Sequence, residues 1–125
     1  MPTLTLYDAL GGAAAFERLV DAFYAGVADD PILRPLYPED LAAPAEHLRL
    51  FLMQYFGGPG TYTRQRGEPR LRLRHLPFRI GQAERDAWLQ HMSAAVATLD
   101  VPELARSQLL SYFADAATFL INAPG

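Results

Sequence analysis

His75 is the residue of this chain whose type and surroundings most clearly suggest chemistry. It lies in the segment Arg72-Leu73-Arg74-His75-Leu76-Pro77-Phe78, between arginines and a proline–phenylalanine pair, and is one of only three histidines. One neutral imidazole can bind a haem iron from one side, and a proline just after the turn would fix its direction of approach. A lone histidine in such a segment is more often a capping or packing residue. The choice depends on side chains elsewhere in the chain.

Other metal or hydrolytic chemistry finds little support in the sequence. The histidines stand at positions 47, 75 and 91 with no pair four residues apart, and the chain has no cysteine. A zinc site needs several such ligands close together, and disulfides or iron–sulfur clusters need cysteine. The motifs of P-loops, dinucleotide sites, zinc proteases and serine hydrolases are also missing.

Three polar aromatic residues could face a ligand bound to such an iron. Tyr24 ends the apolar stripe of one expected helix, Tyr37 precedes Pro38, and Trp88 begins the stripe of a later helix. Each alone is readily explained as a core residue whose polar atom is satisfied locally. Together, their O–H and N–H groups could donate to bound dioxygen, which carries partial negative charge, at about 1 kcal/mol for each bond.

Helical periodicity runs through most of the chain. Between Ala13 and Ala28 the apolar residues fall at i, i+3, i+4, i+7, i+8 and i+11 on one face. Comparable signals predict helices at Leu4–Leu10 with Thr5 as N-cap, Pro31–Leu36 after the N-cap Asp30, Pro44 to just before Gly57, Gln82–Leu99, and a last helix opened by a capping box over Asp100–Glu103.

Two stretches are less regular. Thr61–Pro69 is polar, rich in arginine and without period, so we predict no regular structure there. Arg70–His75 alternates charged residues with leucine, which is typical of a strand, but no partner strand is visible. We therefore predict a short helix or turn that presents His75. The chain as a whole is predicted to be a single all-α domain spanning residues 1–125.

Composition excludes several protein classes. Half of the 125 residues are hydrophobic, which argues against a disordered chain. No apolar run approaches the roughly 20 residues that span a bilayer, and Met1–Thr5 does not resemble a secretory signal. We therefore expect no membrane association, and the lack of cysteine fits a cytoplasmic protein.

The basic residues are unevenly distributed. The net charge of −3 argues against nucleic-acid binding, and every basic side chain is arginine. Six arginines crowd one stretch: Arg64, Arg66, Arg70, Arg72, Arg74 and Arg79. A solvated loop is one explanation, and recognition of carboxylates or phosphates by the planar guanidinium is the other.

With these residues in view, the whole chain resembles the truncated haemoglobins, and specifically their second group. The similarity rests on the double glycines Gly11-Gly12 and Gly57-Gly58, on Tyr55-Phe56-Gly57-Gly58-Pro59, and on Arg74-His75-Leu76-Pro77-Phe78 followed by Glu84-Arg85-Asp86-Ala87-Trp88. The resemblance implies a two-over-two helical sandwich that encloses haem b.

The resemblance also implies roles for individual residues. His75 would be the proximal iron ligand, and Tyr24, Tyr37 and Trp88 would be the polar residues that stabilise a ligand on the distal side. Tyr62 and Arg74 match positions that contact the haem propionates. The remaining expected pocket residues are Phe23, Pro44, His47, Leu48, Phe51, Leu52 and Phe78.

Some positions depart from the pattern of the family. Pro44-Ala45 stands where a polar distal residue is frequent, which leaves hydrogen bonding to the tyrosines and Trp88 and could open a path into the pocket. His47 stands where relatives have a longer cation, so we expect it near a propionate or the surface, with a second iron ligand as the alternative. His91 is expected to be an ordinary surface residue.

The implied function is binding of dioxygen and other diatomic ligands such as carbon monoxide and nitric oxide. Three donors predict slow oxygen release, which suits sensing, redox chemistry or scavenging better than bulk oxygen transport. A nitric oxide dioxygenase or peroxidase-like enzyme is the alternative, and it would need a separate reductase because the chain has no flavin or nicotinamide domain. A haem-free helical interaction module is a third hypothesis. A monomer and a homodimer both remain open.

Overall fold

The computed structural model describes residues 4–124, and within them all regular structure is helical. The expectation about a signal at Met1-Pro2-Thr3 lies outside the described residues. The elements are α1 (Leu6–Leu10), α2 (Ala13–Ala28), the 3₁₀ helix η1 (Arg34–Leu36), α3 (Ala42–Tyr55), α4 (Thr61–Arg66), α5 (Leu71–His75), α6 (Gln82–Ala97) and α7 (Glu103–Phe119). The prediction of an all-α fold is confirmed.

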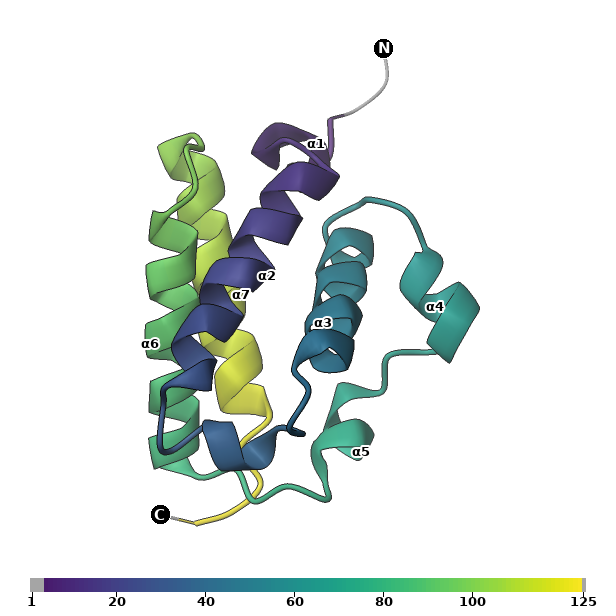
Figure 1. Ribbon diagram of the computed structural model, residues 1–125. Coiled ribbons are helices and arrows are strands. Elements are labelled where there is room, and N and C mark those ends of the chain that lie inside the picture. The colour runs from purple at the N-terminus through teal and green to yellow at the C-terminus, as the bar shows by residue number, and fades with distance from the viewer. Residues whose placement is uncertain (1–3, 125) are drawn as a thin grey trace.

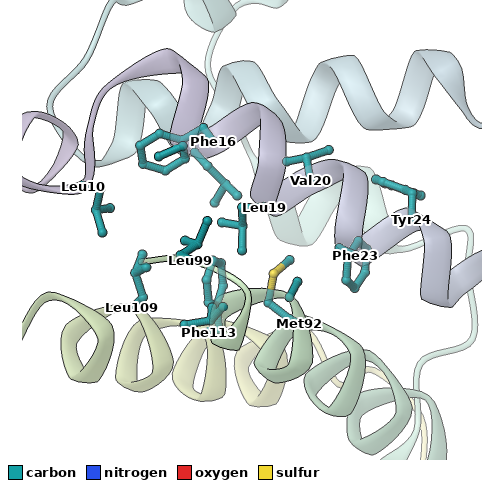
Figure 2. Close-up of a cluster of buried hydrophobic side chains, with 14 of the residues drawn as sticks. Leu10, Phe16, Leu19, Val20, Phe23, Tyr24, Met92, Leu99, Leu109 and Phe113 are labelled. Carbon is teal, nitrogen blue, oxygen red and sulfur yellow. The ribbon is translucent and has the colours of Figure 1, made fainter. Parts of the chain in front are cut away.

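Two pairs of long helices form the body of the fold. Helix α2 packs against both α3 and α6, and α6 packs against α7, while α4 and α5 lie to the side of α3 (Figure 1). The face predicted for α2 is the face that is buried, with Phe16, Phe23 and Val27 at most 1% exposed. Met92 from α6 and Phe113 from α7 complete this core, as Figure 2 shows. None of the described helices is long and apolar enough to cross a membrane.

The second double glycine lets α1 dock against the end of α3. The Tyr7 backbone N–H donates to the Phe56 carbonyl at 2.9 Å, so the two segments run very close together. A Cβ at Gly58 would lie 2.7 Å from the Tyr7 ring, and Gly57 has a φ of +100°. Both positions therefore need glycine, one for space and the other for its backbone conformation.

Thr61–Arg66 forms helix α4, so the prediction of an irregular stretch is wrong. Helix α4 forms because of its tertiary contacts with α3. The Gln54 side chain of α3 accepts a hydrogen bond from the Thr63 N–H at 3.0 Å and donates one to the Thr63 hydroxyl at 2.7 Å. Tyr62 is 4% exposed and packs edge-on against Phe51 at 5.7 Å. These contacts come from another helix, and no local period reveals them.

Two other predicted helix starts and one predicted helix cap are corrected. Asp30 accepts hydrogen bonds from the N–H groups of Ile32 and Leu33, which folds residues 31–33 into turns before η1 rather than a helix from Pro31. Helix α3 begins at Ala42, not at Pro44, and the Asp40 carboxylate accepts from the Ala42 N–H. No side chain caps α7, so the predicted capping box over residues 100–103 is wrong.

Candidate functional site

A large cavity of about 500 Å³ lies between α3, α5, α6 and α7. This size is typical of cofactor and small-ligand sites. All of the residues predicted to form a pocket line it except Phe23. They are Tyr24, Tyr37, Pro44, His47, Leu48, Phe51, Leu52, Tyr62, Arg74, His75, Phe78 and Trp88. The structure therefore brings together side chains that are up to 64 positions apart in the sequence, from Tyr24 to Trp88.

His75, the last residue of α5, is oriented by a hydrogen bond within its own helix. Its Nδ1 lies 2.6 Å from the Leu71 carbonyl oxygen, which can only accept, so Nδ1 carries the proton. The other ring nitrogen, Nε2, is then the one with a free lone pair. A metal-binding histidine is usually held in this way, with one nitrogen donating to a carbonyl and the other available to the metal.

The backbone around His75 is held by Asn122, which follows α7. Its amide nitrogen donates to the His75 carbonyl at 3.2 Å and to the Phe78 carbonyl at 2.9 Å. Its side-chain oxygen accepts from the Ile80 N–H at 2.9 Å. Asn122 thus binds both ends of the turn that follows His75. It is near the end of the chain, and nothing in the sequence pattern pointed to it.

Tyr24, Tyr37 and Trp88 form a connected group at another part of the cavity wall. The rings of Tyr24 and Tyr37 meet edge to face with centroids 5.5 Å apart. Burial raises the pKa of Tyr37 to about 12, although hydrogen bonds from Tyr24 and Trp88 oppose that increase. Burial also raises the pKa of Tyr24 far above its usual range. Both phenols are protonated at neutral pH and remain able to donate.

Phe23 does not line the cavity, in contrast to the expectation from the family. It is fully buried and leaves α2 toward the core, on a different side from Tyr24 (Figure 2). Its ring lies 5.0 Å from Tyr24 and 5.3 Å from Trp88, measured between centroids. Phe23 therefore supports two cavity residues from behind.

A cationic group lies at the side of the cavity near α4. An Arg66 N–H donates to Nε2 of His47 at 3.0 Å. Because arginine can only donate, that nitrogen of His47 must be unprotonated. Burial and the positive charges of Arg66 and Arg74 lower the pKa of His47 below its usual range. His47 is thus neutral, and the charge on this side comes from Arg66, which sequence reasoning did not select.

The hydrogen bonds of the Arg74 side chain go to backbone carbonyls. Its guanidinium donates to the carbonyls of Pro69 at 2.7 Å, Arg66 at 2.8 Å and Glu68 at 3.4 Å. It also lies over the Tyr62 ring, as does Arg66. These bonds hold the loop between α4 and α5 in place and leave Arg66 as the more available partner for an anion.

Sequence reasoning missed the part of the cavity wall that α7 provides. Tyr112, Phe113, Ala116 and Leu120 line the cavity together with Leu71 and Ile80. The apolar face of α7 was visible as a period in the sequence. The period alone does not show whether such a face meets another helix or a cavity.

His91 is not an ordinary surface residue, and that prediction is corrected. Its Nε2 lies 2.6 Å from the Asp30 carboxylate, and the two side chains are 24% and 13% exposed. A Cβ at Gly26 would lie 2.4 Å from the ring, so the glycine of α2 provides the space for it. The pair joins α6 to the start of the segment that carries Leu33, Leu36 and Tyr37 into the cavity.

These features fit a haem. The cavity wall is mostly apolar, as a porphyrin requires, and one imidazole in it has a nitrogen free to bind iron. Arg66 at the side could pair with a propionate carboxylate. His75 would hold the iron, which would supply ligand binding and redox chemistry.

Comparison with known proteins agrees with this fit. The family described as bacterial-like globin matches residues 5–122. The group 2 truncated haemoglobin YjbI of Bacillus subtilis is 47% identical over 90 residues, which cover 72% of this chain and 67% of that protein.

Solved structures show the same similarity over the whole fold. The haemoglobin of Chloroflexus aurantiacus is 57% identical, with a TM-score of 0.95 over 97% of this chain and 100% of the other. The group II truncated haemoglobin of Bacillus anthracis is 38% identical, with a TM-score of 0.96 over 100% of this chain and 96% of the other. The chain therefore belongs to the bacterial-like globins and is a truncated haemoglobin of group II, a family whose members bind haem.

Proposed function

We propose that this protein binds haem b through Nε2 of His75 and that the iron reversibly binds dioxygen and other diatomic ligands. The main observation behind this proposal is how the His75 ring is hydrogen-bonded and where it lies. Its Nδ1 is committed to the Leu71 carbonyl at 2.6 Å, and the ring lines a cavity with three hydrogen-bond donors in its wall. An imidazole used only for packing would not need a large apolar cavity beside it.

The three donors define how a ligand would be held. Tyr24, Tyr37 and Trp88 all line the cavity, and each carries one O–H or N–H proton that can serve as a donor to a bound ligand. Bound dioxygen carries partial negative charge, and each neutral hydrogen bond to it contributes about 1 kcal/mol. Slow oxygen release follows, which favours sensing or redox chemistry over transport.

A redox enzyme at the same site is the second candidate. Oxidation of nitric oxide by bound dioxygen and a peroxidase-like reaction are its two forms, and each would need a separate electron donor. The observation in favour is the number of oxidisable rings in the cavity wall, namely Tyr24, Tyr37, Tyr62, Trp88 and Tyr112. Continuous consumption of nitric oxide in the presence of a reductant would support the enzyme, and consumption in a single turnover only would argue against it.

Spectroscopy of the purified protein tests the proposal directly. Ferric, ferrous and carbonmonoxy forms should each give a haem Soret band with the histidine-ligated pattern. His75→Ala should lose stable haem binding, whereas His91→Ala, which changes a histidine outside the cavity, should retain it. A full haem spectrum in the His75→Ala variant would contradict the assignment of the iron ligand. His47→Ala should keep the ferric spectrum, and a changed coordination state there would identify His47 as a second ligand.

A further inference from the structure

Aromatic side chains continue from the cavity to the protein surface in one place. Tyr112 lines the cavity, and its ring centroid lies 4.3 Å from that of Tyr55, with 33° between the ring planes. Tyr55, the last residue of α3, is 55% exposed. The described residues include all six tyrosines, and Tyr55 is the only exposed one. The pair therefore connects the cofactor site to solvent by direct ring contact.

Two neighbouring phenylalanine rings hold the Tyr55–Tyr112 pair in position. Phe56 lies 5.0 Å from Tyr55 and 5.2 Å from Tyr112, each in an edge-to-face arrangement. Phe51, which also lines the cavity, lies 6.0 Å from Tyr55. Such contacts hold aromatic rings in defined positions. Burial of apolar surface explains Tyr112 and Phe56, but it does not explain why a phenol at the exposed end is stacked so closely on a phenol in the cavity wall.

We propose that Tyr112 and Tyr55 carry oxidising equivalents from the haem pocket to the surface, where Tyr55 is the residue that becomes oxidised. The proposal rests on the haem binding proposed above and names hydrogen peroxide as the oxidant. Bound haem would supply the site of peroxide reduction, in which one hydrogen peroxide takes up two electrons and two protons and gives two waters. The electrons and protons come from two phenols, each of which loses one of each.

The fate of the phenols completes the balance. Two oxidised Tyr55 side chains, from two protein molecules, join through a new carbon–carbon bond and give dityrosine once each ring has lost its proton. The sum is one peroxide and two tyrosines giving one dityrosine and two waters. A small phenol from solution could replace either partner at the exposed ring. The substrate class is therefore phenols, oxidised one electron at a time at the surface.

Burial determines which of the two tyrosines is finally oxidised. Burial raises the pKa of Tyr112 to about 12, and the neighbouring Tyr55 adds to the effect. Tyr112 holds its proton tightly and has no exposed surface comparable to that of Tyr55. The Tyr55 hydroxyl can pass its proton to water as the electron leaves. Tyr112 is therefore the relay and Tyr55 the end point.

The test begins with the haem spectrum of the wild type, followed by hydrogen peroxide added to the ferric form. We expect a covalent dimer with dityrosine fluorescence, mapped to Tyr55 by mass spectrometry of peptides. Tyr55→Phe should abolish the dimer. Tyr112→Phe keeps the ring but removes the oxidisable phenol, and it should slow dimer formation about tenfold or more. Tyr7→Phe, a tyrosine packed on Phe16 outside the cavity, should behave as wild type.

A second oxidant distinguishes electron transfer through Tyr112 from an effect of the Tyr112 substitution on Tyr55 itself. Photochemical oxidation by a ruthenium complex with persulfate attacks exposed tyrosines from solution without using the haem. Tyr112→Phe should cross-link normally under these conditions. If Tyr112→Phe is slowed equally by both oxidants, or not slowed by peroxide, the relay is overturned. A protein with a normal haem spectrum whose cross-link maps to another tyrosine overturns this proposal alone, and failure to bind haem overturns both proposals.

Discussion

The two sides of the cavity are built in different ways. The distal wall, which we define as Tyr24, Tyr37 and Trp88, depends on long helices, with Tyr24 on the 16-residue α2 and Trp88 on the 16-residue α6. The proximal segment, residues 71–80, contains only the five-residue helix α5, and its Leu73, Leu76 and Phe78 are exposed. Side-chain packing holds the first, and hydrogen bonds to backbone carbonyls hold the second.

This difference has consequences for stability. A five-residue helix is not stable alone, because it forms too few hydrogen bonds to offset the entropy of ordering its backbone. The proximal segment therefore depends on Asn122 and Arg74, which reach it from elsewhere in the chain. The distal wall shares the stability of the core, whereas the proximal segment can open locally. In the proposed haem complex, the iron ligand would therefore lie on the less stable segment and the ligand-binding residues on the more rigid wall.

The largest effect is expected from a matched pair of phenylalanine substitutions. Phe23→Ala empties a fully buried site between Tyr24 and Trp88 and should lower the free energy of unfolding by about 3–5 kcal/mol. Phe78→Ala removes a ring of the proximal segment that is 43% exposed and should cost less than about 1.5 kcal/mol. Urea unfolding measures both. Equal losses would show that the two sides are built alike.

A smaller effect is expected from Asn122→Ala. This change removes two bonds to the carbonyls of His75 and Phe78 and one from Ile80, each worth about 1 kcal/mol. We expect faster haem loss to apomyoglobin and a shifted iron–histidine stretch in the Raman spectrum of the ferrous form. Global stability should fall less than in Phe23→Ala. Asn122→Asp retains the acceptor oxygen and should restore only part of the effect, whereas an unchanged stretch would remove Asn122 from the positioning of His75.

Trp88→Phe tests a single donor of the distal wall. An aromatic ring remains to pack on Phe23 and Phe113, but the indole N–H is lost. We expect dioxygen to dissociate about fivefold faster, which corresponds to about 1 kcal/mol for one neutral hydrogen bond. Stopped-flow measurement of the dissociation rate provides the check. An unaltered rate would mean that Trp88 does not act on the ligand.

The smallest expected effect is a change in stability at acidic pH. The hydrogen bond from His91, together with the N–H groups of Leu33 and Ile32, lowers the pKa of Asp30 below its usual range. A carboxyl with a lowered pKa stabilises the fold above its ordinary pKa, and that contribution disappears as the pH falls through the lowered value. The stability difference between wild type and Asp30→Asn should therefore shrink below about pH 4. A difference that stays constant through this pH range would contradict the role of Asp30.

Much of the fold and of the site could be predicted because each rests on local patterns. The faces of α2, α6 and α7 appear as helical periods, since one face of each helix must leave water. His75, Tyr24, Tyr37 and Trp88 are distinctive residue types in recognisable surroundings, and all of them line the cavity. The resemblance of spaced glycine and histidine motifs added the family, which the similarity to solved globins confirms.

The failures have a common cause in long-range contacts. Helix α4 forms because Gln54 bonds to Thr63, and His91 forms a hydrogen bond because Asp30 lies beside it, 61 positions away. Phe23 and Tyr24 are neighbours in sequence, but only the placement of α6 and η1 decides which of them meets the core and which meets the cavity. No local period distinguishes the two.

The sequence by itself therefore determined most of the long helices and the family, because these depend on residue type and spacing. The tertiary structure alone decided that Arg74 holds a loop while Arg66 faces His47. It likewise decided that Asn122 supports His75 and that Tyr55 meets Tyr112. The physical reason is that hydrogen bonds and ring contacts between distant segments depend on where whole helices pack, which no short stretch of the chain specifies.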